Sequence, residues 1–213
     1  YRHLGDEEMT ATALEELESA GLRAQEAVRI HNEAVALSRS GDDEAAFARF
    51  QEALAVDPNL DTALLGVATT GLEIGRYEAA ARAAEKLLVT DPGNGQALRV
   101  RYNAALGLQD PEMIADALVG LARVEPEVAV EGLSQLALAA YDVGDAARAK
   151  DLFRRVLEID PRHAQSHYHI GLLYLREEAN GDAIRHLQRF LELAPDHPEA
   201  PTARDILDYL KQS

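Results

Sequence analysis

The feature that most constrains this chain is a set of prolines that recur at a nearly constant interval. They stand at positions 58, 92, 126, 161 and 195, so successive intervals are 34, 34, 35 and 34 residues. The first four follow an acidic residue, as in Asp57-Pro58, and the fifth follows Ala194. A constant period of this size predicts an array in which one supersecondary motif is repeated and stacked.

Other positions keep the same phase as the prolines. An alanine stands 12 residues before four of them, and a residue that is apolar in every repeat stands 8 before all five. Glycine stands 17 residues before three prolines, at Gly41, Gly75 and Gly144. Gln109 and Glu178 occupy that place in the third and fifth repeats. Because both lack the conformational freedom of glycine, we expect altered turns there.

Each repeat is predicted to hold two helices. In the first repeat, Ile30, Ala34 and Leu37 share one helical face, and the turn at Gly41 ends that helix. The acidic residues 42–44 then suit the first turn of a second helix, where the helix dipole favours negative charge. The proline stops the second helix, since it lacks an N–H and disfavours helix in the preceding residue. No alternating β pattern occurs, so the predicted fold class is all-α.

Composition excludes several functions. The chain has 21 basic and 37 acidic residues, a net charge of −16, which disfavours nucleic acid or an anionic membrane surface as its main partner. With no cysteine there is no disulfide, thiolate zinc site or cysteine nucleophile. No apolar run approaches the roughly 18 residues that suggest a membrane-spanning helix, so we expect no direct membrane insertion.

The period, the glycine turn, the small residue and the Asp-Pro ending resemble the tetratricopeptide repeat (TPR) family. The resemblance covers five repeats, residues 27–60, 61–94, 95–128, 130–163 and 164–197. It implies a right-handed superhelical α-solenoid whose concave groove binds peptides. More loosely, residues 97–102 and 191–196 resemble the C-terminal repeat region of bacterial proteins with an upstream carboxypeptidase-regulatory-like domain. That likeness implies a cell-envelope or periplasmic location over a cytoplasmic one.

Both ends of an array need covering, because each exposes an apolar helix face. Residues 198–213 are predicted to form a C-terminal capping helix with an apolar stripe from Ala203 to Leu210. Residues 1–26 are predicted to be a linker followed by a short capping helix. That helix would begin at a capping box, Thr12 with Glu15, and would end at residues 19–21, Ser-Ala-Gly.

The resemblance also predicts which side chains line the groove. In the family, the first helix of each repeat faces the concave side, so the family positions can be carried onto this sequence. Arg99 and Asn103 offer donors that suit a carboxylate or a peptide carbonyl, and tyrosines with leucines suit apolar anchors. The predicted groove residues are Leu65, Thr69, Arg99, Asn103, Leu138, Tyr141, Tyr168, Leu172 and Arg176.

The histidines are the sharpest candidates for chemistry. His163 and His167 stand four residues apart and could hold zinc from one helix face, near His169 and His186. His167 also falls at an apolar packing position, and no His-Glu-x-x-His motif supplies a general base. No phosphate-binding glycine loop or nucleophile elbow is present either. We therefore expect no enzyme, no cofactor and no metal site.

The sequence thus favours a non-enzymatic scaffold that binds a protein or peptide in a concave groove. Two alternatives stay open. The array could be a structural spacer or a self-associating module attached to an upstream domain, which would make a homo-oligomer possible. It could instead sense a metal ion or pH through its histidine cluster, because imidazoles titrate near neutral pH.

Overall fold

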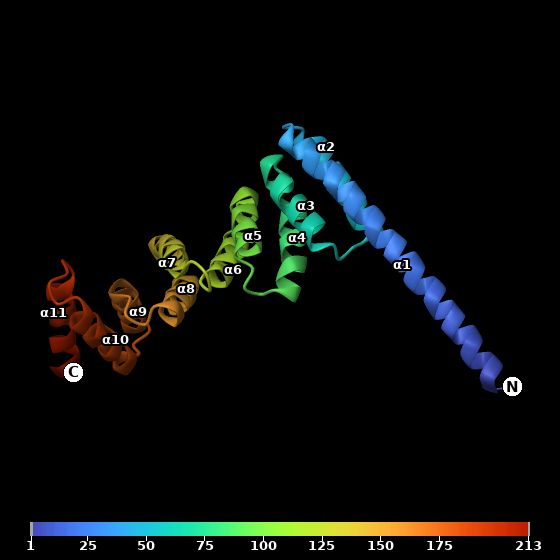
Figure 1. The fold of residues 1–213 in the computed structure, drawn as a ribbon. Helices are drawn as coiled ribbons and strands as arrows, with labels where there is room; N and C mark the ends of the chain where they lie inside the picture. Colours follow the sequence, from blue (N-terminus) through green and yellow to red (C-terminus); the bar gives the residue numbers. More distant parts are fainter. Residues whose placement is uncertain (1, 213) are drawn as a thin grey trace. The chain divides into compact units, whose positions relative to one another are not determined.

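The computed structural model describes the backbone of residues 2–212 and the side chains of residues 16–212, and every regular element in it is an α-helix (Figure 1). The chain divides into two compact units, Tyr1–Gln109 and Asp110–Ser213. The first contains α1 (Arg2–Arg39), α2 (Asp43–Val56), α3 (Asp61–Glu73), α4 (Tyr77–Thr90) and α5 (Gly95–Leu108). The second contains α6 (Pro111–Leu121), α7 (Pro126–Asp142), α8 (Ala146–Ile159), α9 (Ala164–Arg176), α10 (Asn180–Leu193) and α11 (Ala200–Gln212).

Within the first compact unit, helices pack in sequence order. α1 packs on α2 and α3 on α4, while contacts of α2 with α3 and of α4 with α5 join these pairs. Alanines at the predicted small position, Ala46 and Ala80, are fully buried, and so is Ala84. Because alanine has no side chain beyond Cβ, the helix backbones can approach closely at these points. The core is therefore built from small residues with a few large ones between them.

Glycines inside helices receive the large side chains of their neighbours. A Cβ on Gly66 of α3 would lie 2.5 Å from the Phe50 ring of α2, and one on Gly107 of α5 would lie 2.5 Å from the Tyr77 ring. Gly171 of α9 is in the same relation to a leucine of α10, whose side chain would be 2.8 Å from the added Cβ. At these places the neighbouring ring or isobutyl group occupies the space that a side chain would need.

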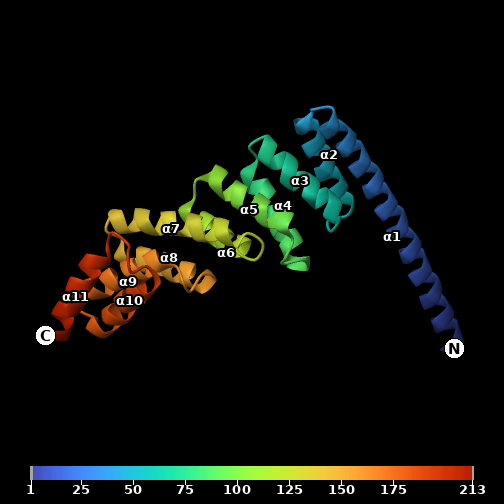
Figure 2. The same ribbon diagram turned by 60° about the vertical axis from the view of Figure 1, so that its left-hand side comes forward.

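In the second compact unit, each of the six helices packs on the next, from α6 to α11 (Figure 2). The last helix buries Ala203, Leu207 and Leu210, and its apolar face meets Leu187 and Phe190 of α10. The predicted C-terminal stripe is thus the surface by which α11 covers the end of this unit.

The turns between helices use a left-handed residue. Gly41, Gly75 and Gly144 have φ of +82°, +72° and +82°. Gln109 and Glu178 adopt the same region, with φ of +56° and +59°. The expectation of altered turns is therefore wrong, because the backbone keeps the left-handed residue and accepts the strain of a side chain there.

The Asp-Pro pairs build the corners between repeats. The Asp57 carboxylate accepts a hydrogen bond from the N–H of Asn59 at 3.0 Å, and Asp91 and Asp160 accept the N–H two residues on at 3.0 and 2.9 Å. The proline between them has no N–H to satisfy. Such a side-chain turn explains why aspartate in particular precedes the proline.

Three sequence expectations differ from the structure. α1 is one continuous helix through residues 19–21, where an end was predicted, because Ser19 bonds back to the Glu16 carbonyl and no proline follows. The side chains of the proposed capping box, Thr12 and Glu15, lie outside the described residues, and residues 2–8 are helix, not linker. α7 begins at Pro126, four residues before the predicted fourth repeat, since proline fits the first turn of a helix.

The third predicted repeat, residues 95–128, also departs from expectation. The boundary between the two compact units falls between α5 and α6, which are the two helices of this repeat. α5 packs on α3 and α4, and α6 packs on α7. Each helix therefore belongs to the core of a different compact unit.

Substituting Gly66 tests the glycine contacts. We expect Gly66→Ala to destabilise the protein by about 1–3 kcal/mol, because the added methyl overlaps the buried Phe50 ring. Gly21→Ala is the matched control in α1, where nothing lies within 4 Å, and should stabilise by about 0.5–1 kcal/mol through helix propensity. Urea unfolding followed by circular dichroism measures both, and equal effects would contradict the contact.

Substituting Glu178 tests the strained turn. We expect Glu178→Gly to raise the free energy of unfolding by about 0.5–1 kcal/mol, because glycine adopts a φ of +59° without a steric penalty. The reverse change at an equivalent turn, Gly144→Ala, should lower it by a similar amount. Thermal unfolding of the two variants should therefore move in opposite directions from the wild type.

Candidate functional site

The nine predicted groove residues all lie on the first helices of their repeats. Leu65 and Thr69 of α3 and Arg99 and Asn103 of α5 belong to the first compact unit, and the other five, on α7 and α9, belong to the second. We therefore describe two separate sets of side chains.

In the first set, the two side chains of α3 have few groups available to a partner. Leu65 is half-buried and packs on the core, and the Thr69 hydroxyl donates to the Leu65 carbonyl at 2.9 Å. Arg99 and Asn103 are exposed and one helical turn apart on α5. The polar half of this set is thus the part that a partner can reach.

Tyr168 of the second set is a core residue, which corrects the prediction for it. Its side chain is only 7% exposed, its ring centroid lies 5.0 Å from that of Phe190, and its hydroxyl donates to Glu199 at 2.9 Å. Burial first, and then the Glu199 carboxylate, raise the pKa of Tyr168 to about 12. The segment that leads into α11 therefore covers the tyrosine that was predicted to anchor a partner.

The remaining members of the second set keep a solvent-facing surface. Leu138, Tyr141 and Leu172 are half-buried, and Arg176 is exposed. The Tyr141 ring lies 5.0 Å from the His169 ring, so the side chains of α7 and α9 meet here. We call Leu138, Tyr141 and Leu172 the α7–α9 face.

The histidines form contacts other than the predicted pair. His163 caps α9 and accepts the Ser166 N–H at 3.3 Å. His167 instead faces His186 of α10, with 3.0 Å between their Nδ1 atoms, and its Nε2 lies 3.2 Å from the Pro161 carbonyl. Among residues 16–212, no three histidine, aspartate or glutamate side chains gather as metal ligands. His163 and His167 therefore contact different groups, His163 the Ser166 backbone and side chain, and His167 the His186 ring and the Pro161 carbonyl.

Burial shifts the titration of these imidazoles. Desolvation lowers the pKa of His163, His167 and His169. It also lowers the pKa of His186 to about 4, with the neighbouring His167 as the next cause. Burial disfavours the charged form because a low-dielectric environment solvates it poorly. The cluster therefore stays uncharged at neutral pH.

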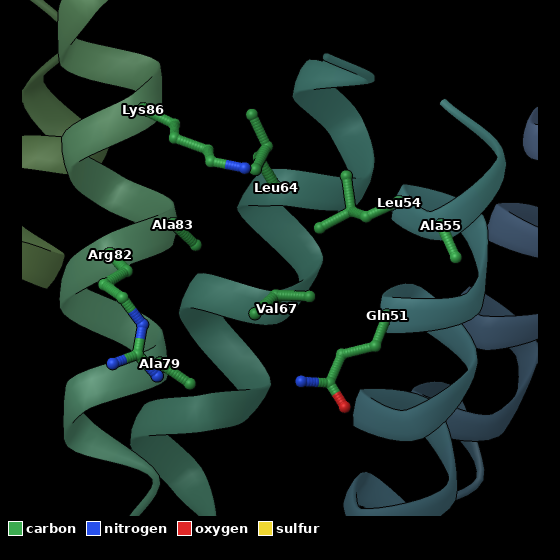
Figure 3. Close-up of a pocket in the computed structure, with 9 residues that line it drawn as sticks. All are labelled: Gln51, Leu54, Ala55, Leu64, Val67, Ala79, Arg82, Ala83 and Lys86. Carbon is green, nitrogen blue, oxygen red and sulfur yellow. The ribbon is translucent and has the colours of Figure 1, made fainter. Parts of the chain in front are cut away.

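A groove in the first compact unit lies among α2, α3 and α4 (Figure 3). Its volume is about 330 Å³. Arg82 and Lys86 come from α4 and Gln51 from α2, while α3 forms the middle wall with Leu64 and Val67. Figure 3 shows Lys86 reaching from α4 toward Leu64. We call this hollow the α2–α4 groove.

The tetratricopeptide repeat model matches residues 31–97 and 134–198, which together exceed half of the chain. The chain belongs to the tetratricopeptide repeat family. Its membership makes it a scaffold for protein–protein interaction in general terms.

Solved structures of TPR proteins match the chain. A TPR repeats protein from Bacteroides fragilis NCTC 9343 is 13% identical, with a TM-score of 0.64, covering 87% of this chain and 98% of its own. YrrB, described as a TPR protein with an unusual peptide-binding site, is 26% identical over 92% of this chain and 97% of its own, with a TM-score of 0.44. MamA is 22% identical over 76% of this chain and 94% of its own, also at 0.44. No curated protein matches the sequence.

The positions of the TPR repeats in the sequence did not predict the α2–α4 groove. Its lining comes mainly from the second helices of two repeats, whereas the family's binding positions lie on the first helices. The available signal was the pair Arg82 and Lys86, which stand one helical turn apart on α4.

In the described part of this TPR chain, no helix is long and apolar enough to cross a membrane.

The lowered histidine pKa values predict acid sensitivity in this TPR chain. When unfolded, His186 takes up a proton below its ordinary pKa of about 6.5, while the folded protein does not until about pH 4. Its contribution to stability is therefore complete above pH 6.5 and falls as pH drops from 6.5 toward 4. We expect the urea midpoint to fall between pH 7.5 and 5, and to fall less in His186→Gln. An imidazole NMR titration of His186 near 6.5 would contradict this.

Proposed function

We propose that this TPR chain is a non-enzymatic scaffold that binds a protein or peptide partner, and that the α7–α9 face is a principal binding surface. One observation carries the proposal. Leu138, Tyr141 and Leu172 remain partly exposed on neighbouring first helices, the side of the repeat that carries ligands in this family.

Leu172 packs on the core cluster that contains Tyr168 and Phe190, so only part of its side chain is open to a partner. Leu133 and Ala137 of α7 are fully buried, and Ile170 and Leu173 of α9 are buried beside them. Other side chains thus fill the centre of these two helices, and the exposed parts of the α7–α9 face are left for binding. Large apolar and aromatic side chains that lie at the centre of an interface supply most of its binding free energy.

Charge and donors add specificity to this surface. Arg176 is exposed near the end of α9, and Arg99 and Asn103 provide exposed polar groups in the first compact unit. The net charge of −16 should speed encounter with partners that carry positive charge, and added salt should slow it. These groups would orient a partner, while the α7–α9 face would hold it.

The test begins by identifying the partner. A photo-crosslinking amino acid at position 138 would capture the bound protein from cells, and mass spectrometry would identify it. Calorimetry with the purified partner should then show at least tenfold weaker binding to the Leu138→Ala/Tyr141→Ala double variant. The reason is that the double variant removes two apolar anchors from one surface.

A second double variant provides the control. Val28 of α1 and Val89 of α4 are 44% and 82% exposed and belong to the first compact unit, so Val28→Ala/Val89→Ala should bind normally. Circular dichroism must show both variants folded. Unchanged affinity in the folded Leu138→Ala/Tyr141→Ala protein would count against the proposal.

A further inference from the structure

The α2–α4 groove differs in chemistry from the rest of this acidic chain. Its apolar surface comes from Leu54, Leu64 and Val67 and from three alanines, and its polar groups are Gln51, Arg82 and Lys86. No carboxylate lines it, although the chain has 37 acidic residues. The groove thus combines an apolar floor with two positive charges at one rim.

The two cations at this rim differ from the other arginines of the same compact unit. Arg29 and Arg49, in the same compact unit, each bind two glutamates. Arg82 and Lys86 take part in no ion pair within residues 16–212. Since they stand four residues apart on α4, both can reach the same side of a bound molecule.

The groove continues beyond these residues. A second hollow of about 520 Å³ shares Gln51, Ala79 and Arg82 with it and extends to Arg76. Arg76, just before α4, is also without an ion pair in the described part of the chain, while Glu44 and Glu78 line this second hollow. From Arg76 to Lys86 the distance along the helix is roughly 15 Å, at 1.5 Å per residue. About ten residues of a partner helix, or five of an extended strand, would span it.

We propose that the α2–α4 groove binds an acidic amphipathic segment of a partner protein. The apolar side chains of that segment would lie against Leu54, Ala55 and Ala79, above the buried Leu64 and Val67. Its carboxylates would pair with Arg82 and Lys86. Arginine can hold a carboxylate through two parallel hydrogen bonds, while lysine acts as a point charge that adapts to its position. The apolar floor supplies affinity, and the cations select the sign of charge.

The acidic character of the whole chain does not oppose this binding at short range. At physiological ionic strength, charges farther apart than about 8 Å are largely screened. The cations at the rim contact the partner directly, whereas Glu44 and Glu78 line the neighbouring hollow. The groove is therefore a local site that favours a negatively charged partner, whereas the acidic surface as a whole favours a positively charged one.

A random library of 16-residue peptides displayed on phage is the probe. The library is selected for binding to the immobilised full chain. Peptides that also bind the Ala55→Trp variant are then removed. Ala55 is an exposed position on α2 that lines the groove, so the indole of the variant would fill it. Peptides that bind the wild type but not Ala55→Trp should be rich in aspartate and glutamate around apolar positions. Groove-dependent peptides that are neutral or basic, or the absence of any groove-dependent peptide, would overturn the proposal.

Charge reversal tests the two cations separately. A labelled peptide from the selection should bind Arg82→Glu/Lys86→Glu at least tenfold more weakly by fluorescence anisotropy, since it loses two ion pairs and gains repulsion. Arg162→Glu/Lys211→Glu changes the net charge equally, on the second compact unit, and should bind normally. Equal loss in both double variants would show a general charge effect and overturn the assignment.

Two further readouts complete the test. Ala147→Trp places the same bulky side chain at an exposed position of α8 and should leave peptide binding unchanged, which separates blockage of the groove from unfolding. Analytical ultracentrifugation should find the wild type to be free of any dimer that forms through this groove, that is, any dimer that is lost in Ala55→Trp. Such a dimer would assign the groove to a second copy of this chain and overturn the partner assignment. Because the α7–α9 face lies in the other compact unit, its variants fail or succeed independently of these.

Discussion

The structure depends on small residues of one helix that receive large residues of the next. Gly66 accepts the Phe50 ring, Gly107 accepts the Tyr77 ring, and Gly171 accepts a leucine of α10. Each contact joins a helix only to its neighbour, so cohesion is a sum of nearest-neighbour terms rather than the property of one central core. This arrangement leaves many helix surfaces that are not needed for packing between helices, and these surfaces are available for binding.

The two candidate surfaces follow from that freedom and have different chemistry. The α7–α9 face offers partly exposed leucine and tyrosine side chains. The α2–α4 groove offers an apolar floor with Arg82 and Lys86 at its rim. One lies on first helices and the other mainly on second helices, in separate compact units. A scaffold with two such surfaces can hold two different partners on one chain.

Much of the fold could be predicted because the residues that end its helices act locally. The binding site depends instead on contacts between residues far apart in the sequence. The proline period gave the helix pairs, but the covering of Tyr168 depends on Glu199, 31 residues away. The left-handed backbone at Glu178 was missed because the turn is imposed by the helices around it rather than by its own residue. The α2–α4 groove was missed because two exposed cations on one helix resemble ordinary solvated charges until the hollow beside them is known.

The corners at Asp57, Asp91 and Asp160 have a consequence for how the chain acquires its structure. Each is closed by a hydrogen bond that spans only two residues, so it can form as soon as its own residues exist. Contacts between residues close in sequence are reached quickly, because little loop entropy must be lost first. During synthesis, the helix pairs of such a chain can assemble one after another as they leave the ribosome, without waiting for the far terminus.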